Sequence, residues 1–197
     1  MTIINGSALL RAAPLSPMLA TKERAHGVTF GLGEAGFDIR LKENVRFVPP
    51  DPVGFAKLAG LQVFDGFAAD VMKEAFHGYT EVNGERRLGR FALASSLESF
   101  QMPDDLVAIF HDKSTHARRA ISVFNTVLEP GWGPSPDRPD EGCFLTIEIV
   151  FHGDTPITIP AGSGIGQLIF HRLEEPAHYT GRYTGQPSRA VAAIMEG

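Results

Sequence analysis

A short basic segment with the sequence DKSTHARR, at residues 112–119, holds the residue types that most readily bind a phosphate group. Three cationic side chains surround the hydroxyls of Ser114 and Thr115, and cations form charge-assisted hydrogen bonds with phosphate oxygens. Ser114 is predicted to cap the turn that follows, where free N–H groups would face an anion. Arg118 lies four residues further on, one helical turn away, so both side chains can face one ligand. The alternative is a solvated basic turn without a ligand.

A carboxylate interrupts a segment that is otherwise apolar, CFLTIEIVF at residues 143–151. Alternate residues of a strand point to opposite faces, so Glu148 should share its face with Phe144, Thr146 and Val150. A carboxylate among apolar neighbours is uncommon, and loss of water raises its pKa toward the range useful for proton transfer. Glu148 is therefore a candidate general acid and base. The alternative is a glutamate on an edge strand that faces water.

The sequence does not favour two common kinds of cofactor site. Zinc-dependent nucleobase deaminases need an H-x-E motif and a paired-cysteine motif, but no histidine here has Glu two residues on, and Cys143 is the single cysteine. The glycines of GLGEAG at residues 31–36 fit the GxGxxG pattern, yet a strand-like alternation follows where a dinucleotide site needs a helix. We therefore expect turn glycines, no protein-held metal and no zinc.

Short strands should position these residues. Alternation and turn residues predict strands at 37–41, 90–95, 106–110, 121–127, 144–151 and 165–171, an edge-like piece at 156–160, and turns at 102–105 and 161–164. Short helices are expected at 5–13, with Asn5 as N-cap and Pro14 after its end, and at 67–76. Residues 15–35 are turn-rich, and 78–87 should form a polar hairpin or loop. Such spacing suggests a β-sandwich, jelly roll or barrel.

Composition limits the class of protein. A length of 197 residues fits one domain, in which we expect N-terminal helix, strand and loop elements at 1–87, a β core at 88–175 and a tail or lid at 176–197. The net charge of −5 does not favour a bulk electrostatic grip on nucleic acid. No apolar run is long enough to span a membrane. A lone cysteine and a start unlike a signal peptide favour a cytoplasmic protein.

Several motifs together resemble those of the dCTP deaminase family, in the dCTP deaminase and dUTPase superfamily. That family's motifs run roughly as GKSSLAR, IDPGW, LTLE, IGQL and YxGKYxGQ. Here the corresponding segments, in the same order, are KSTHAR at 113–118, LEPGW at 128–132, LTIE at 145–148, IGQL at 165–168 and YTGRYTGQ at 179–186. Residues 37–41, FDIRL, resemble an early S-x-D-[IV]-R-L strand. The motifs extend from the early part of the chain to its last segment.

The resemblance implies a mainly β fold, a distorted jelly-roll or β-barrel of the dUTPase-like type. It also implies a homotrimer with active sites between subunits. The implied reaction is zinc-free hydrolysis of the cytosine amino group of dCTP, giving dUTP and ammonia, with Mg2+ bound through the triphosphate. Neither nucleic acid nor membrane is an expected partner.

Roles for individual residues follow from the same resemblance. Proton transfer falls to Glu148, and Arg118 and Ser114 would position the water and the glutamate. Trp132 would pack on the deoxyribose, and the tail would close over the nucleotide. The implied substrate-binding residues are Lys113, Ser114, Thr115, His116, Ala117, Arg118, Glu129, Trp132, Thr146, Ile147, Tyr179, Arg182 and Gln186.

The departures from the family pattern cluster around the expected base and sugar pocket. The chain is two residues shorter between Arg118 and the Glu-Pro-Gly-Trp turn, Glu129 replaces an aspartate, and residues 133–141 are inserted. One alternative is therefore a dUTP or dNTP diphosphatase, or a bifunctional enzyme, in which the acid at Glu129 activates water at phosphorus. Another is a non-catalytic nucleotide-binding protein. Glu148 favours deamination, because the diphosphatase branch usually lacks a glutamate at this place.

Overall fold

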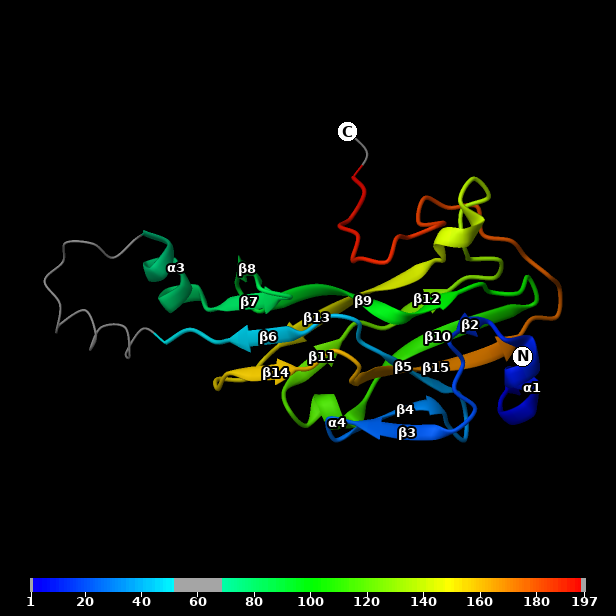
Figure 1. Ribbon diagram of the computed structural model, residues 1–197, viewed down its shortest axis with the longest axis horizontal. Helices are drawn as coiled ribbons and strands as arrows, with labels where there is room; N and C mark the ends of the chain where they lie inside the picture. Colours follow the sequence, from blue (N-terminus) through cyan, green and yellow to red (C-terminus); the bar gives the residue numbers. More distant parts are fainter. Residues whose placement is uncertain (1, 52–68, 196–197) are drawn as a thin grey trace, which may run out of the picture.

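The computed structural model describes residues 2–51 and 69–195. The chain is mainly β with a few short helices, as predicted (Figure 1). Two sheets form the body of the molecule, and a third sheet extends from it together with helix α3. The helical elements are α1 (Gly6–Ala12), α3 (Ala69–His77), α4 (Ser114–Ala117) and the 3-10 turn η1 (Pro139–Glu141).

All the strand pairs within the described residues run antiparallel. The first sheet has the order β12 (Thr126–Leu128), β10 (Leu106–Asp112), β15 (Gly164–Arg172), β5 (Phe37–Arg40), β4 (Val28–Leu32) and β3 (Lys22–Ala25), with β1 (Thr2–Ile4) also on β15. The second has the order β11 (Ile121–Val123), β13 (Phe144–Phe151), β9 (Phe91–Phe100) and β2 (Leu15–Ser16). The third has the order β14 (Ile157–Ile159), β6 (Val45–Val48), β7 (Tyr79–Val82) and β8 (Glu85–Leu88).

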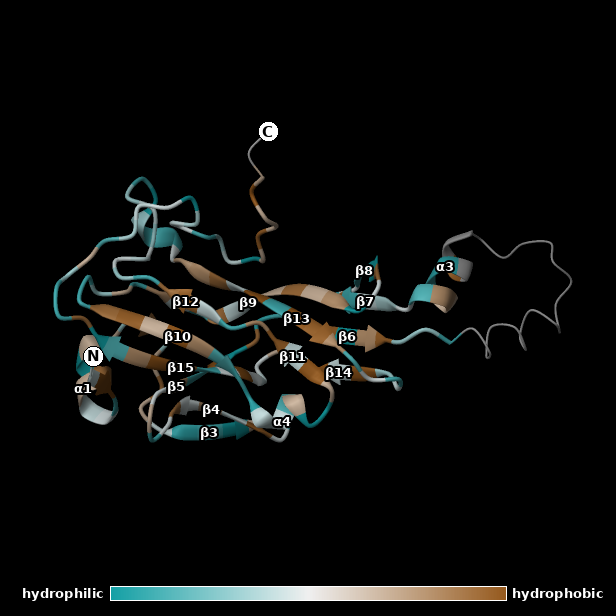
Figure 2. Ribbon diagram, turned by 180° about the vertical axis from the view of Figure 1, so that it is seen from behind, coloured by the Kyte–Doolittle hydropathy of each residue, from teal (hydrophilic) through white to brown (hydrophobic). Residues whose placement is uncertain are grey.

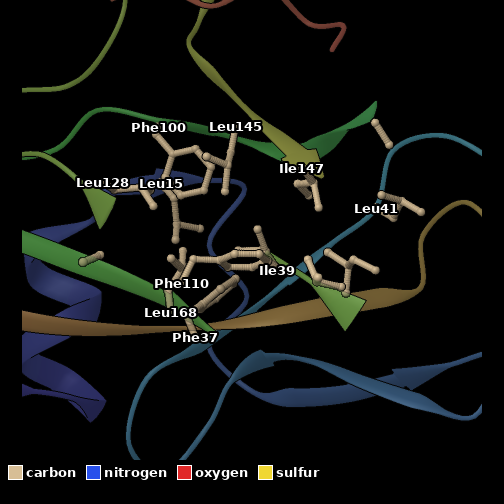
Figure 3. Packing of buried hydrophobic residues seen from close by; sticks show 14 of the residues in the cluster. Leu15, Phe37, Ile39, Leu41, Phe100, Phe110, Leu128, Leu145, Ile147 and Leu168 are labelled. Atoms are coloured by element: carbon tan, nitrogen blue, oxygen red, sulfur yellow. The ribbon is translucent and has the colours of Figure 1, made fainter. Parts of the chain in front are cut away.

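The hydrophobic core fills the space between the first two sheets (Figure 3). The buried side chains that meet there include Phe37, Phe110 and Leu168 of the first sheet and Phe100, Leu145 and Ile147 of the second. Burial of each such side chain contributes about 1.5–3 kcal/mol. Edge strand β3, by contrast, is hydrophilic along most of its length (Figure 2). The core thus anchors β13, the strand that carries Glu148.

The prediction of a single strand at 121–127 is wrong, because the chain passes from one sheet to another within this segment. Strand β11 pairs with β13 of the second sheet, whereas β12 pairs with β10 of the first. Residues Phe124 and Asn125 make the crossing, and the Asn125 side-chain oxygen accepts a hydrogen bond from the Asp112 N–H at 3.3 Å. Strand β13 has the predicted limits, while β9 extends beyond the predicted 90–95 to Phe100.

Residues 15–35, which were expected to be only turn-rich, contain the β3–β4 hairpin. Its turn residues His26 and Gly27 both have positive φ, 51° and 80°. The sequence Lys-Glu-Arg-Ala of β3 lacks alternation, so its strand could not be found by period. Of the GxGxxG glycines, Gly36 lies where an added Cβ would come within 2.0 Å of the Leu168 carbonyl oxygen. Close strand packing, and not a dinucleotide, therefore explains this glycine.

The two predicted helices and the polar hairpin are also present. Asn5 is the N-cap residue of α1, but its side chain donates to the Glu34 carbonyl oxygen at 2.7 Å and does not cap the helix. Helix α3 ends one residue beyond the prediction, and residues 67 and 68 of that prediction lie outside the described residues. Strands β7 and β8 form the hairpin expected at 78–87. In the described ranges, no helix is long and apolar enough to cross a bilayer.

Candidate active site

A pocket of about 500 Å3 lies between strands of the first two sheets and the C-terminal tail, the segment that follows β15. Strands β9, β12 and β13 form one side, and tail residues form the other. Residues singled out in the sequence that line it are Glu129, Trp132, Thr146, Glu148, Tyr179 and Gln186. The fold therefore gathers, in one cavity, residues from three separate motifs of the chain.

Glu148 lies on the pocket face of β13 and is half-buried. Its cross-strand neighbour on β9 is Leu93, and the next pair on the same face is Phe91 with Val150. Burial among these groups raises the pKa of Glu148 above its ordinary value of 4.5. Ile147 points to the other face and is only 1% exposed. The predicted alternation along this strand is confirmed.

A bulge in β9 changes how the start of β13 is bonded. Phe144 pairs with Ser99, but Thr146, two residues on, pairs with Ser95, so β9 has extra residues here. Neighbouring N–H groups of β13 therefore donate outside the regular ladder. The N–H of Leu145 donates to the Ser96 hydroxyl at 2.9 Å, and the N–H of Thr146 donates to the Gln186 side-chain oxygen at 3.2 Å.

The tail is docked along one side of the pocket by hydrogen bonds to β13 and to the Glu-Pro-Gly-Trp turn. The Tyr179 N–H donates to the Pro130 carbonyl at 2.8 Å, and the Trp132 indole N–H donates to the Tyr183 carbonyl at 2.8 Å. Further on, the Val191 N–H donates to the Thr146 hydroxyl at 3.0 Å. The segment predicted as a tail or lid is thus held by its own chain in this structure.

The segment inserted at 133–141 contributes to this docking. The Gly185 N–H donates to the Gly133 carbonyl at 2.9 Å. Gly185 has a φ of 68°, and a Cβ at this position would lie 2.8 Å from Ser135. Only glycine fits such a close approach with positive φ. The glycine in the tail motif is therefore explained by contact with the insertion.

Trp132 and Glu129 present two kinds of surface to the pocket. The Trp132 ring is 6% exposed and packs on Phe100, with ring centroids 5.7 Å apart. Glu129 is exposed, and its carbonyl accepts from the Trp132 N–H at 3.1 Å within the turn. A rigid aromatic wall beside a solvated carboxylate can bind a group that is apolar on one side and carries a hydroxyl on the other.

The basic block at 113–118 forms helix α4 and the residues on either side of it. The prediction that Ser114 caps this helix is wrong: Ser114 is its first helical residue, and Lys113 is the N-cap. Lys113 retains strand-like backbone angles, and its carbonyl accepts from the N–H groups of His116 and Ala117. The side chains of Ser114 and Arg118 are exposed.

His116 differs from its neighbours in being completely buried. One ring nitrogen, Nε2, lies 2.8 Å from the Gly164 carbonyl oxygen of β15. Burial lowers the pKa of His116, so the ring is neutral and donates from Nε2. The histidine thus ties α4 to the first sheet.

Comparison with known proteins places this geometry in a family. The sequence profile described as dCTP deaminase-like matches residues 29–173. A protein of Campylobacter lari named dCTP deaminase is 33% identical over 180 residues, which cover 86% of this chain and 83% of that protein. One of Nautilia profundicola with the same name is 30% identical over 186 residues, covering 87% of this chain and 85% of that protein. The chain belongs to the dCTP deaminase-like family.

A solved structure supports the fold. The 2'-deoxycytidine 5'-triphosphate deaminase from Agrobacterium tumefaciens matches with a TM-score of 0.51 at 15% identity. The match covers 88% of this chain and half (50%) of that one. At this identity the likeness shows the fold alone. The resemblance seen in the motifs is thereby confirmed at the level of family and fold.

This dCTP deaminase-like chain does not bring all the expected site residues together. None of the residues 113–118 lines the pocket that holds Glu148, and α4 lies far from the tail (Figure 1). The Ile147 side chain belongs to the core. Arg182 is exposed and donates to the Ile194 carbonyl at 2.8 Å, within the tail. In a single chain the acid and base candidate and the basic block are thus separate.

Sequence reasoning missed the partner of Lys113 in this dCTP deaminase-like fold. The Lys113 ammonium donates to the Asp38 carboxylate and, at 3.2 Å, to the Thr29 hydroxyl. Asp38 lies on β5 and is almost completely buried. The alternation of FDIRL already placed this carboxylate opposite the buried Phe37 and Ile39. Because Asp38 shares that face with Arg40, the alternation predicted a polar side toward solvent and gave no signal that Asp38 is buried.

Proposed function

We propose that this protein hydrolyses the exocyclic amino group of dCTP, releasing dUTP and ammonia. The observation that carries the proposal is the half-buried carboxylate of Glu148, with its raised pKa, in the wall of a 500 Å3 pocket beside Trp132. The names of the relatives support the choice of substrate. A carboxylate with a raised pKa accepts a proton more readily than an ordinary glutamate.

In this mechanism Glu148 takes a proton from water as the water oxygen bonds to C4 of cytosine. Glu148 delivers this proton to N3 as the C4=N3 double bond opens. It then takes the proton of the new C4 hydroxyl and gives it to the amino nitrogen, so the C4=O bond forms as the C4–N bond breaks and ammonia leaves. The apolar cross-strand neighbour Leu93 reduces the hydration of the carboxylate, which raises its pKa and makes it a stronger base. The described residues hold no group of three His, Cys, Asp or Glu side chains suited to a metal ion. In the proposed reaction Mg2+ would arrive with the triphosphate, as the family resemblance implies.

The rest of the substrate would use the turn, the tail and the basic block. Trp132 would pack against the deoxyribose, with Glu129 accepting a hydrogen bond from its hydroxyl. Tyr179, Arg182 and Gln186 would contact the nucleotide from the tail side, and Thr146 would contact it from strand β13. The proposal includes the homotrimer that the family resemblance implies. In it the Ser114 and Arg118 block, which does not line the pocket of its own chain, would reach the pocket of a neighbouring subunit. We further propose a cytoplasmic location.

The test is an incubation of the purified protein with dCTP and Mg2+, followed by assay of ammonia and separation of the nucleotides. Deamination predicts ammonia in equal amount to a uracil nucleotide, with little reaction of CTP. Release of dCMP and pyrophosphate without ammonia would overturn the proposal.

A bifunctional enzyme, or a diphosphatase, is the second candidate. The observation that favours it is Glu129, an exposed carboxylate in the same pocket as Glu148. In this second candidate function, Glu129 would activate water toward the phosphate end of a nucleotide. In the same incubation, dUMP with pyrophosphate would identify this second activity, whereas dUTP alone would exclude it.

A further inference from the structure

The block at 113–118 contains a cation that is turned inward. The Lys113 side chain is 11% exposed, and the Asp38 side chain that it pairs with is 4% exposed. The Thr29 hydroxyl, on β4, contacts both: it lies 3.2 Å from the Lys113 ammonium and 3.3 Å from the Asp38 carboxylate. Three side chains from β4, β5 and the start of α4 thus form one buried polar cluster.

This cluster is hard to open. Asp38 depends on Lys113 for its charge balance, since its other oxygen, Oδ1, is buried and has no hydrogen-bond partner in the described structure. A lysine that swung out to a phosphate would leave this carboxylate buried and unpaired, which is strongly unfavourable. Arg118, by contrast, is exposed and can reach a ligand without breaking any such pair.

The buried pair also lies where it can orient α4. The Lys113 backbone begins the helix, because its carbonyl accepts from His116 and Ala117, while its side chain is fastened to β5. A second tether joins His116 to the Gly164 carbonyl of β15, the strand next to β5. Two tethers therefore hold the inner side of the helix and leave Ser114 and Arg118 outward.

We propose that Lys113 and Asp38 are positioning residues, which set α4 so that Ser114 and Arg118 bind the triphosphate, and that Lys113 itself does not contact phosphate. This inference rests on the proposed nucleotide site but not on the reaction performed there. Two substitutions separate it from the simpler assignment of Lys113 as a phosphate ligand. If Lys113 is a ligand held back by Asp38, neutralising Asp38 frees it; if the two act as a pair, neutralising Asp38 harms the site.

The experiment measures binding of tripolyphosphate and of dCTP with Mg2+ by calorimetry, in the full-length protein carrying Glu148→Gln to slow turnover. Asp38→Asn and Lys113→Met should each weaken tripolyphosphate binding by about 10-fold, a misplacement effect of modest size. The double variant Lys113→Met/Asp38→Leu, which replaces the pair by apolar groups of similar size, should recover most of the affinity. Arg118→Met should weaken binding in every background.

Tighter or unchanged binding by Asp38→Asn, together with loss in Lys113→Met and no recovery in the double variant, would overturn the inference and make Lys113 a phosphate ligand. Thermal unfolding of each variant is measured in parallel, and the tripolyphosphate affinities are compared at a temperature well below each unfolding midpoint. A purely structural role of the pair would then lower the unfolding midpoint but leave the tripolyphosphate affinity unchanged. If a single variant fails to fold, the affinity of the double variant is enough to test the inference. If Lys113 were a phosphate ligand, apolar packing in its place could not restore the affinity for tripolyphosphate. Absence of ammonia release would refute the proposed reaction and leave this comparison intact.

Discussion

The side-chain oxygen of Gln186 lies 3.2 Å from both the backbone nitrogen and the hydroxyl of Thr146, and accepts a hydrogen bond from each. The two residues are 40 positions apart, and Thr146 is on the strand that carries Glu148. One amide thus closes the tail onto the pocket. The tail conformation and access to Glu148 are therefore coupled.

The single cysteine offers a direct measure of this closure. Cys143 is fully buried against the backbone of Gly185 and Gln186, and burial raises the pKa of its thiol to about 11. Gln186→Leu, or truncation after His178, should expose the thiol and speed its reaction with a disulfide reagent at pH 8 by more than about 10-fold. The core should remain folded by circular dichroism. Glu175→Gln, in the exposed segment before the tail motif, is the matched control. Equal labelling rates would show that the tail does not cover Cys143 in solution.

Glu148→Gln should lower turnover of dCTP by roughly 100- to 10,000-fold, because the amide keeps the shape but cannot carry a proton. The free energy of unfolding of the Glu148→Gln variant should not fall at neutral pH. The folded state raises the pKa of Glu148, so ionisation costs stability at neutral pH, and that cost disappears below the ordinary value of 4.5. The variant should therefore unfold at the same temperature as the parent, or higher, at pH 7, and any advantage should vanish near pH 4. The control is Glu23→Gln, at an exposed glutamate. Near-normal activity of Glu148→Gln would contradict the role of Glu148 in proton transfer.

The rate should depend on pH through the same group. The acidic limb of a plot of kcat/KM for dCTP reports the pKa of Glu148 in the free enzyme and should lie above 4.5. Replacing its cross-strand neighbour, Leu93→Asn, should hydrate the carboxylate and move the limb to lower pH. Desolvation would not be the cause of the raised pKa if the acidic limb of the parent lay at an ordinary glutamate value. The same would follow if Leu93→Asn left the limb unchanged.

A buried ion pair elsewhere should be important for stability. Glu98 is fully buried, and its two oxygens accept from the Arg40 backbone N–H at 2.8 Å and the Arg40 guanidinium at 2.7 Å. Arg40→Met would leave this charge unpaired and should lower the free energy of unfolding by about 3–5 kcal/mol. Arg86, half-exposed beside Glu74 and Glu81, is the matched control, and Arg86→Met should cost less than about 1 kcal/mol. If urea unfolding gave equal losses of unfolding free energy for Arg40→Met and Arg86→Met, the buried pair would be no more important than the exposed one.

The sequence alone predicted what depends on neighbouring residues along the chain. The period of two in residues 143–151 placed Glu148 opposite the core, because side-chain alternation is a property of any strand. Ordered motifs identified the family, and turn residues marked the β7–β8 hairpin. Local patterns of this kind need no knowledge of the partner strand.

Only the tertiary structure decided which distant segments meet. Period and composition could not show that residues 121–127 divide between two sheets, since that break depends on the different partners of β11 and β12. Nor could they show that Lys113 is paired with Asp38, 75 residues earlier, or that Gln186 bonds Thr146. Residue type alone assigned Lys113 a place beside phosphate, but the free energy of a buried carboxylate depends on which cation the fold brings to it. Such contacts arise from the packing of whole sheets, and a linear pattern does not contain them.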